Sequence, residues 1–599
     1  MNKKSLLSLF LAIVMSVSLF ACTPASPDTP DNPDSPAPAT GAVYDFGKGE
    51  RTYTAKAPNT VVPDFSGVTN EMKVISWSSV DGNDVQRDYF KTAGFNTTYI
   101  QLYEGYVVGT EAGREKLRKL CEYYSANGID FYYVVNNGWQ TRGNGMQLEA
   151  SKGPNYFYRS LRVFLDAGLD LTQYSTFKGI LVFDEPGGEY GTIKSKIYND
   201  FDFLVGNYDS DGDGVPDTWR FKYDASNKFI EGGDYTNSSG QIKHINLLES
   251  FFGAGGYEVK TEDGEKYVYG PSQYEIFKSL WGENGVFKTG TYKDYEFRIN
   301  MAGSFKYDLE QFDARMLPII VADGGKITVS IDHYALGYDA QKDEPKFNTS
   351  RVLEVWAYGA DMKKRYGVDL DGFLLTGQQN VVEGFARGDD ADGFWSESEM
   401  RWQYYSTMAF GADSMQYFVY YTMGTEVGSG QYLGVIDSAG RAPTKAFEYS
   451  KNVNAEAQKM YKATSGFDFE GAICSVGTRN KNGYNDLFDN LSAKYKVRKH
   501  DLINSFTSTR DTLVTCFKNS DYDAFMLMNV EDPYYKRTDK VTVGFNGATR
   551  AYVYGRTKQS LSGAETEYSD VEGRVVELDG GKLTLDIDYG DAVFVVPLA

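Results

Sequence analysis

The amino-acid sequence predicts an α/β protein, a (β/α)8 TIM barrel followed by a C-terminal antiparallel β-sandwich. Two observations lead to this fold class. Between residues 72 and 422, apolar runs of strand length recur with helical stretches between most of them, and such alternation gives parallel strands with right-handed crossovers. From Phe467 onward the runs are short and alternating, and Asn-Gly, Asp-Gly and Gly-Gly turns separate them, as in antiparallel sheets. A doubly wound open sheet is the alternative for the first part.

Residues 1–22 predict export, because two lysines precede an apolar stretch too short for a lasting membrane span. This segment resembles a bacterial lipoprotein signal, which implies cleavage before Cys22 and acylation of that cysteine. An ordinary secreted protein is the alternative. Residues 23–42, rich in Pro and Asp, predict an extended spacer that holds the folded part away from a membrane. We expect an exported protein, lipid-anchored to the bacterial cell membrane or outer membrane.

Charge and cysteine content narrow the class of ligand. The formal net charge is -21 over 599 residues, and phosphate binding needs clustered Lys and Arg. We therefore expect no nucleic acid partner, whereas a neutral carbohydrate is compatible and a membrane is reached only through the lipid. The oligomeric state stays open. Cys121, Cys474 and Cys516 form neither a disulfide scaffold nor a zinc motif, and the last two either pair or stay free.

The first four strands alternate with helices along the chain. The expected strands are residues 72–80, 97–105, 129–137 and 178–186. The helices between them are expected at residues 85–95, 112–128 and 156–169. Gly94 and Gly128 stand where helix C-termini commonly need a residue of positive φ.

Four more strands complete the predicted barrel. They are expected at residues 244–250, 326–336, 372–382 and 414–422. Between the last two, residues 396–412 predict a helix, in which Ser396 and Glu399 have the spacing of a capping box. These elements place the barrel domain at residues 43–466 and the sandwich, expected to pack beside it, at residues 467–599.

The fourth run, ILVFDEP, ends in Asp184, Glu185 and Pro186. A capped turn is the ordinary interpretation, since Asp and Pro both favour turns. The alternative is that a strand buried on both faces presents these acids at the C-terminal mouth of a barrel, where chemistry collects.

A series of motifs from Lys73 to Phe467 resembles bacterial glycoside-hydrolase-type barrels, similar to the β-galactosidase-like relatives of clan A glycosidases. The motifs agree in order and spacing. They are Asp184-Glu185-Pro186 on the fourth strand, Asn246-Leu247-Leu248 on the fifth, Asp332-His333-Tyr334 on the sixth, Gln378-Gln379 on the seventh, the helix Arg401-Trp402-Gln403-Tyr404-Tyr405 with Ala409-Phe410-Gly411-Ala412, and Tyr417-Phe418-Val419-Tyr420 on the eighth.

The resemblance implies that Glu185 is the general acid/base, with Asp184 beside it holding geometry and charge. The chain departs from clan A at the seventh strand, where Gln378 and Gln379 stand in place of the nucleophilic glutamate. Glycosidic hydrolysis needs a second carboxylate, and we expect Asp332 in this role because VSIDHY repeats the layout of VFDEP. Glu104 and Glu383 are the other candidates. Alternatively, Asp332 only hydrogen-bonds hydroxyl groups or caps a loop.

Residues at the predicted strand ends are candidates for sugar contact, although most aromatic residues in a barrel are core. The candidates are Trp77, Tyr103, Glu104, Asn136, Asn137, Trp139, Asp184, Tyr334, Gln378, Gln379, Tyr420 and Tyr421. His244 and His333 have no second His or Cys at metal-ligand spacing, so packed or hydrogen-bonded histidines are expected.

The segment NYDSDGDGVPDTW, near residues 207–219, predicts a structural calcium site. Its ligands would be Asp209, Asp211, Asp213, Val215 through its backbone oxygen, and Asp217. The segment resembles the calcium loops of thrombospondin-type and dockerin repeats, but it has no Glu at the twelfth position of a full EF-hand. A solvated acidic turn is the alternative. No organic cofactor is expected.

Two functions of different class follow from these patterns. The first is a glycoside hydrolase that acts on a neutral oligo- or polysaccharide at the cell envelope by a two-carboxylate mechanism. The second is a non-catalytic glycan-binding surface lipoprotein on a degenerate TIM barrel, which the glutamine pair favours. A structural surface protein without a sugar ligand is a third, weaker interpretation.

Overall fold

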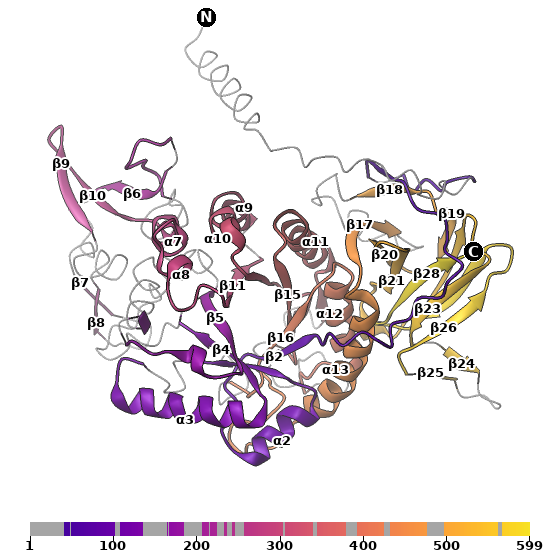
Figure 1. The fold of residues 1–599 in the computed structure, drawn as a ribbon, viewed down its shortest axis with the longest axis horizontal. Helices are drawn as coiled ribbons and strands as arrows, with labels where there is room; N and C mark the ends of the chain where they lie inside the picture. Colours follow the sequence, from indigo (N-terminus) through magenta and orange to yellow (C-terminus); the bar gives the residue numbers. More distant parts are fainter. Residues whose placement is uncertain are drawn as a thin grey trace, which may run out of the picture.

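The computed structural model shows a closed barrel beside a pair of antiparallel sheets (Figure 1). The predicted fold class is therefore confirmed, and the open doubly wound sheet is wrong. The described residues are 41–47, 49–101, 108–135, 164–165, 167–184, 206–214, 216–223, 233–236, 242–245, 257–303, 306–339, 344–378, 392–423, 432–475, 496–556, 558–560, 566–568 and 570–599.

Eight parallel strands close the barrel in the order β11-β12-β15-β16-β2-β3-β4-β5. Their bounds are β2 Lys73–Ser76, β3 Thr97–Ile100, β4 Asp130–Val134, β5 Phe177–Asp184, β11 Glu296–Ala302, β12 Ile327–Asp332, β15 Asp369–Leu375 and β16 Ser414–Phe418. Seven of them coincide with predicted strands.

The fifth strand of the barrel differs from the prediction. It is β11, Glu296–Ala302, which pairs in parallel with β5 and β12. The predicted strand at residues 244–250 overlaps only β8, Ile242–Ile245, which forms an antiparallel hairpin with β7, Gly233–Thr236. The Asn-Leu-Leu motif at residues 246–248 lies outside the described residues, and β11 holds the place in the barrel that was predicted for it. β11 reads EFRINMA, and its inward side chains are polar, so it lacks the continuous apolar run by which the other strands are recognised.

Helices cover the outside of the barrel. The longer ones are α2 Asp84–Thr92, α3 Glu111–Asn127, α7 Gln273–Trp281, α11 Thr349–Tyr366, α12 Glu397–Met408 and α13 Lys445–Thr464. The shorter helical segments are η3 Leu171–Gln173, α8 Val286–Thr289, α9 Lys306–Gln311, η5 Phe312–Met316, α10 Leu317–Val321, η6 Ala322–Gly324 and η9 Pro533–Tyr535. The predicted capping box at Ser396 and Glu399 is confirmed, and Gly128 ends α3 with a φ of 61°. Most of the helix expected at residues 156–169 lies outside the described residues.

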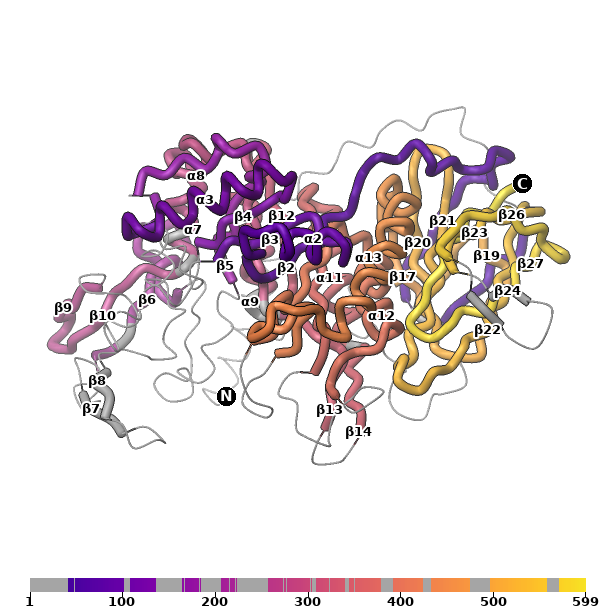
Figure 2. Tube along the Cα trace, turned by 90° about the horizontal axis from the view of Figure 1, so that it is seen from below, coloured from indigo at the N-terminus to yellow at the C-terminus, as the bar shows by residue number. Residues whose placement is uncertain are grey.

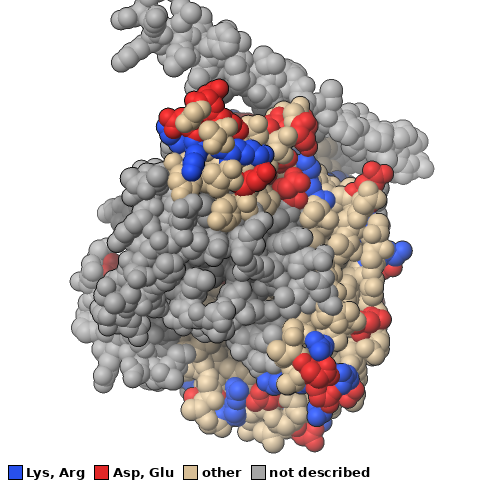
Figure 3. Space-filling model, turned by 90° about the vertical axis from the view of Figure 1, so that its left-hand side faces the viewer, with Lys and Arg blue, Asp and Glu red and all other residues tan. Residues whose placement is uncertain are grey.

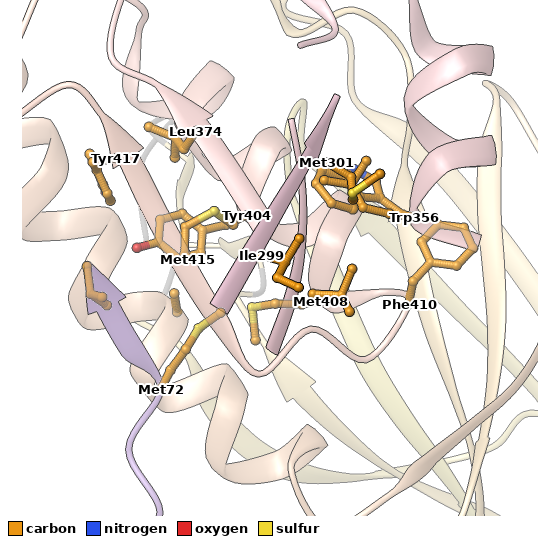
Figure 4. Packing of buried hydrophobic residues seen from close by; sticks show 14 of the residues in the cluster. Met72, Ile299, Met301, Trp356, Leu374, Tyr404, Met408, Phe410, Met415 and Tyr417 are labelled. Carbon is orange, nitrogen blue, oxygen red and sulfur yellow. The ribbon is translucent and has the colours of Figure 1, made fainter. Parts of the chain in front are cut away.

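The main hydrophobic core lies between the barrel strands and these helices (Figure 4). Ile299 and Met301 of β11 point away from the lumen, and Trp356 of α11 lies beside Met301. All three are essentially inaccessible to solvent. Burial of each such side chain contributes about 1.5–3 kcal/mol. The alternate residues of β11 face the lumen, so one strand serves both the core and the site.

The C-terminal part is a β-sandwich. Its larger sheet has the order β17-β20-β21-β28-β23-β26, and its smaller sheet has the order β19-β22-β27. The bounds are β17 Asp468–Ser475, β19 Ile503–Ser508, β20 Thr512–Lys518, β21 Asp523–Asn529, β22 Asp539–Phe545, β23 Arg550–Gly555, β26 Glu572–Glu577, β27 Lys582–Ile587 and β28 Ala592–Leu598. Alternate side chains such as Phe525 of the larger sheet and Val541 of the smaller one form a second core between the sheets.

The N-terminal segment belongs with the sandwich. β1, Arg51–Tyr53, pairs with β18, Val497–His500, and Asn59 bridges to Leu598 of β28. Both views show this segment following the sandwich before the chain enters the barrel at β2 (Figures 1 and 2). A barrel domain beginning at residue 43, as the sequence suggested, would include this segment although it packs on the other domain.

Of the two alternatives left open for Cys474 and Cys516, pairing does not occur, because Cys516 is a free cysteine. Cys516 on β20 lies opposite Gly471, whereas Cys474 lies opposite Leu513. The two backbone positions are therefore three residues out of register. Cys516 and Cys121 are buried free thiols, as the other interpretation of the cysteines expected.

Further short sheets lie outside the barrel sheet and the two sandwich sheets, and Figure 2 shows the one formed by β6, β10 and β9 away from the sandwich. β6 Thr218–Lys222, β10 Glu265–Pro271 and β9 Glu258–Glu262 form a three-stranded sheet in the long connection between β5 and β11. The remaining hairpins are β13 Leu336–Asp339 with β14 Glu344–Phe347, and β24 Lys558–Ser560 with β25 Thr566–Tyr568. Among the described residues, no helix has both the length and the apolar character needed to cross a membrane.

Candidate active site

A charged network fills the lower part of the barrel lumen. The carboxylate of Glu296 receives a hydrogen bond from Lys73 Nζ at 2.6 Å, although β2 and β11 lie on opposite sides of the ring. It also accepts from Tyr132 at 2.7 Å, Thr328 at 2.5 Å and Arg298 at 2.9 Å. Burial would raise the pKa of Glu296, but Arg298 and Lys73 outweigh it and lower the pKa below its ordinary value. Glu296 is therefore a structural carboxylate at the barrel floor.

Arg298 connects this carboxylate with a second one. Its guanidinium group donates to Asp371 of β15 and, at 3.1 Å, to Ser414 of β16. Gln416 donates to the same Asp371 carboxylate. Burial raises the pKa of Asp371, and the charge of Arg298 opposes this effect. One member of the pair cannot be removed without stranding the other in the interior. Together with the bonds to Glu296, this network joins six strands of the barrel, β2, β4, β11, β12, β15 and β16.

Aromatic side chains close the lumen above the charged network. Trp77 packs against Tyr99 and Phe373, with ring centroids 5.0 and 5.2 Å apart. Tyr334 and Phe418 pack against this cluster but remain partly exposed. The lumen beneath the mouth is thus filled by aromatic side chains, and among them Tyr334 and Phe418 remain partly accessible.

Three polar side chains share one row across adjacent strands at the C-terminal mouth. The strand register aligns Asp184 of β5 with Asn300 of β11, and Asn300 with Ser330 of β12. Asn300 Nδ2 donates to Asp184 Oδ1 at 2.9 Å, and Ser330 Oγ donates to Asn300 Oδ1 at 3.1 Å. Asn300 and Ser330 are each 1% exposed, whereas Asp184 is partly exposed. The end of β5 is therefore bonded through side chains to its neighbour β11, and through Asn300 to β12 beyond it.

Asp332 lies one row nearer the mouth. It is the last residue of β12, aligned with Ala302 of β11, and it is partly exposed. Because side chains alternate along a strand, Asp332 points to the same side as Ser330, which is the lumen. One strand, β11, separates it from Asp184, and two strand spacings amount to about 10 Å. The structure thus brings both acidic strand ends to the same mouth on either side of β11.

Several predicted site residues lie outside the described residues. Glu185 follows Asp184 directly, but its separation from Asp332 is not defined. The others are Cys22, Tyr103, Glu104, Asn136, Asn137, Trp139, Val215, Gln379 and Glu383.

The described candidates divide into rim and core. Tyr334 lies at the rim, and Trp77 lies in the floor at 7% exposure. Tyr420 was predicted to contact sugar, but it is fully buried and packs against Phe90 and Phe95 on the helix side. That prediction is wrong, because β16 ends at Phe418 and its alternation does not continue to Tyr420.

Gln378 and Tyr421 are also buried, whereas His333 is partly exposed. Gln378 is 5% exposed, and its backbone N–H donates to Gly393 at 2.7 Å. Tyr421 is 6% exposed and donates to Gln86. His333 is a packed histidine, as expected: burial, assisted by Arg351, lowers its pKa to about 4. His244 lies in the β7–β8 hairpin, opposite Asp234.

The aspartate loop brings three of its four carboxylates together. Asp209, Asp211 and Asp213 each offer an oxygen within 4.8 Å of the others. Both oxygens of Asp209 accept backbone N–H groups at 2.7 Å, and these bonds lower its pKa. Asp217 lies apart from the group: it is 2% exposed and accepts from the backbone and hydroxyl of Ser210 at 3.2 and 3.1 Å. The carboxylate ligand set predicted for a cation is therefore reduced to three.

Sequence reasoning missed Asn300 and Ser330. Both occupy inward positions of barrel strands, and Asn300 lies on the strand that was not recognised. The signal that would have found it is the period-two alternation of polar residues in EFRINMA, at Glu296, Arg298 and Asn300.

Charges on the described surface are mixed. On the face in Figure 3, basic and acidic side chains lie next to one another. On the β6, β9 and β10 sheet, for example, Lys260 pairs with Glu258 at 2.8 Å and Lys222 with Glu265 at 2.9 Å. Such a surface does not attract a polyanion.

Comparison with known proteins adds solved structures only. No protein-family model matches the sequence, and no curated protein matches it. A variant of a glycoside hydrolase family 42 β-galactosidase from G. stearothermophilus has 9% identity and a TM-score of 0.45, with 90% of this chain and 99% of that chain covered. A β-galactosidase from Bacillus circulans sp. alkalophilus has 11% identity and a TM-score of 0.44, covering 89% and 100%. A glycoside hydrolase family 5 protein from Bacteroides vulgatus has 11% identity and a TM-score of 0.39, covering 93% of both chains. Overlaps of this size carry no information on the reaction, which has to be argued from the site itself.

Proposed function

We propose that the protein is a glycoside hydrolase that acts on a neutral oligo- or polysaccharide. The observation that carries the proposal is the pair of acidic strand ends, Asp184 and Asp332, on either side of β11 at the C-terminal mouth of the barrel. They stand over an aromatic floor, and active sites of such barrels lie at this end. A neutral substrate is consistent with the acidic chain, because no phosphate-binding basic cluster is needed.

In the proposed reaction, Glu185 protonates the glycosidic oxygen as the bond to the anomeric carbon breaks. Asp332 is the second carboxylate. It either attacks the anomeric carbon directly or removes a proton from the attacking water. Carboxyl groups about 5 Å apart give retention of configuration, and a separation of about 6.5–9.5 Å gives inversion. Asp184, held by Asn300, fixes the strand end from which Glu185 follows.

Hydrolysis of a panel of neutral glycans and aryl glycosides tests this proposal. We expect Glu185→Gln and Asp332→Asn each to lower kcat/KM by about 10²–10⁴-fold on substrates with poor leaving groups. Asp263→Asn, in the exposed turn between β9 and β10, is the matched control and should leave the rate unchanged. Wild-type rates in the two mouth variants would refute the assignment.

Glycan binding without turnover is the second candidate function. What favours it is Gln378, which follows the seventh strand where a clan A enzyme has its nucleophile. If the wild-type protein hydrolyses none of the panel but calorimetry detects a bound glycan, and Asp184→Asn weakens that binding, the binding function replaces the hydrolase.

We also propose that the protein is exported and anchored to the cell envelope by a lipid on Cys22. The proposal rests on the sequence of residues 1–42. Its test is the partition of wild-type protein and Cys22→Ser between membrane and soluble fractions. Equal partition of the two proteins would overturn it.

For the aspartate loop we propose a structural Ca²⁺ ion. The carboxylate oxygens of Asp209, Asp211 and Asp213 lie close enough together to share one cation. Lys278 Nζ lies 3.5 Å from Asp211, so the loop already draws a positive charge toward itself. Calorimetric titration with Ca²⁺ tests the site, and no heat of binding would overturn it.

A further inference from the structure

We propose that Asn300 is a positioning residue that sets the orientation of Asp184 at the end of β5, with Ser330 contacting the other side of its amide. The inference deepens the proposed function and rests on it. Asn300 acts through Asp184, so it is not assigned a direct contact with substrate.

The seam, by which we mean the line along which β5 pairs with β11, needs a side chain that fixes the end of β5. The two strands are adjacent in the barrel but are separated by the long connection from residue 185 to residue 295. Their ladder is also irregular: Arg298 lies opposite Leu181, but the next residue of β11 lies opposite Phe183. An extra residue of this kind turns the strand and frees it from regular pairing. The irregularity immediately precedes Asp184, so the backbone ladder alone does not define the direction of the motif.

Close approach of the two strands begins lower in the seam. Gly179 of β5 has a φ of 157°, and a Cβ at this position would lie 1.8 Å from the backbone oxygen of Glu296. Only glycine fits here. The seam is therefore fixed by backbone contact at its lower end and by the bond from Asn300 to Asp184 at the mouth.

The amide of Asn300 has a defined direction. An ionised carboxylate only accepts, so Asn300 Nδ2 faces Asp184 Oδ1 at 2.9 Å and Asn300 Oδ1 faces Ser330 Oγ at 3.1 Å. The Ile299 backbone oxygen is a second acceptor for Ser330 Oγ, at 3.3 Å. Both Asn300 and Ser330 are 1% exposed, so the amide has no access to water on its own side, whereas Asp184 is partly exposed. A hydrogen bond from a buried amide to a carboxylate is among the stronger ones in proteins. The row Ser330–Asn300–Asp184 thus transmits the fixed position of β12 to the end of β5.

The charged groups around this row have other partners or lie one row away. Arg298, two residues earlier on β11, bonds Glu296 and Asp371. Asp332, the nearest acid on β12, lies one row nearer the mouth. The direct neighbour of the Asn300 amide on β5 is Asp184.

Three variants test the inference. Asn300→Ala removes the bond and should lower kcat by at least about 10-fold with KM within about twofold, since misplacement of a catalytic group by 1 Å costs on the order of 10²-fold. Asn300→Asp places two carboxylates at hydrogen-bond distance. They repel when both are charged and share a proton in acid. Its activity should therefore recover toward wild type as the pH falls, whereas Asn300→Ala stays low at every pH. Ser330→Ala should show a weaker form of the Ala phenotype.

A readout that needs no activity separates this inference from the proposed function. The midpoint of thermal unfolding of Asn300→Asp should fall relative to wild type at neutral pH and recover in acid. The double variant Asn300→Asp/Asp184→Asn, which restores an amide–carboxylate pair, should lose this pH dependence. An identical pH dependence in the single and double variants would overturn the inference.

Activity then decides the remaining outcomes. If the wild type hydrolyses the panel and Asn300→Ala keeps its kcat, the positioning role is overturned although the proposed hydrolase stands. If the wild type hydrolyses nothing, the proposed hydrolase fails. In that case the calorimetric affinity of Asn300→Ala for the glycan bound by the wild type tests the role, and an unchanged affinity overturns it.

Discussion

Replacement of Arg298 by methionine would take the central cation out of the barrel floor. Arg298 is 1% exposed and bonds Glu296, Asp371 and Ser414. Glu296 would keep Lys73 at 2.6 Å and a tyrosine hydroxyl, so the loss falls mainly on Asp371. Stranding one member of a buried ion pair costs about 3–5 kcal/mol. We expect the free energy of unfolding of the barrel to fall by this amount.

The dependence of this loss on pH has a definite sign. Burial raises the pKa of Asp371 and the charge of Arg298 opposes it, so the pKa rises further in the variant. A carboxyl group with a raised folded-state pKa binds its proton more tightly in the folded state, and stability is gained as the pH falls through that pKa. The cost of Arg298→Met should therefore shrink in acid. In the double variant Arg298→Met/Asp371→Asn the cost should be smaller than in the single variant at neutral pH.

Hydrogen exchange measured by mass spectrometry checks this prediction locally. Peptides from β11 and β15 should lose protection, while peptides from β20 and β21 of the sandwich serve as the internal control. Arg498→Met, at an exposed pair with Asp45, is the matched variant and should leave the protection of β11 and β15 unchanged. Unchanged protection of β11, or a double variant less stable than the single one, would refute the reasoning.

Three further predictions concern the domain interface, the aspartate loop and the thiols. Burial raises the pKa of Asp591 to about 6, although arginines such as Arg556, at 3.2 Å, oppose this shift. The free energy of unfolding should therefore increase by on the order of 3 kcal/mol as the pH falls from about 6 toward 4. Thermal unfolding of Asp591→Asn should lack this pH dependence. Asp211→Asn should weaken calorimetric Ca²⁺ binding at least about 10-fold while Asp263→Asn does not, since each carboxylate ligand adds charge to the site. Cys516 should react with a thiol reagent only after unfolding, because it is fully buried and its pKa is raised by burial; rapid reaction of the folded protein would contradict this.

Prediction from sequence succeeded best where the types of neighbouring residues directly reflect the burial and capping of an element. β5 and β12 are buried on both faces and read as continuous apolar runs, so their positions and their terminal acids were found. The capping box at Ser396 and Glu399 was found because its partners are three residues apart and need no tertiary contact.

Tertiary structure alone decided the fifth strand and the contents of the lumen. The inner side of β11 carries Glu296, Arg298 and Asn300. Their partners lie on β2, β15 and β5, far away in the sequence, so the local pattern did not reveal this strand. A polar residue in a strand is predicted to be exposed as long as the side chain that pairs with it is unknown. The same reason hid the burial of Tyr420, which depends on Phe90 and Phe95.

The sequence by itself determined the barrel and sandwich, the acids at the ends of β5 and β12, and the aspartate loop, because each follows from neighbours within a few residues. The tertiary structure decided which strand stands between those acids and which side chains hold them. Barrel closure joins strands that lie more than a hundred residues apart in the sequence. The hydrogen bond from Asn300 to Asp184 forms only after that closure.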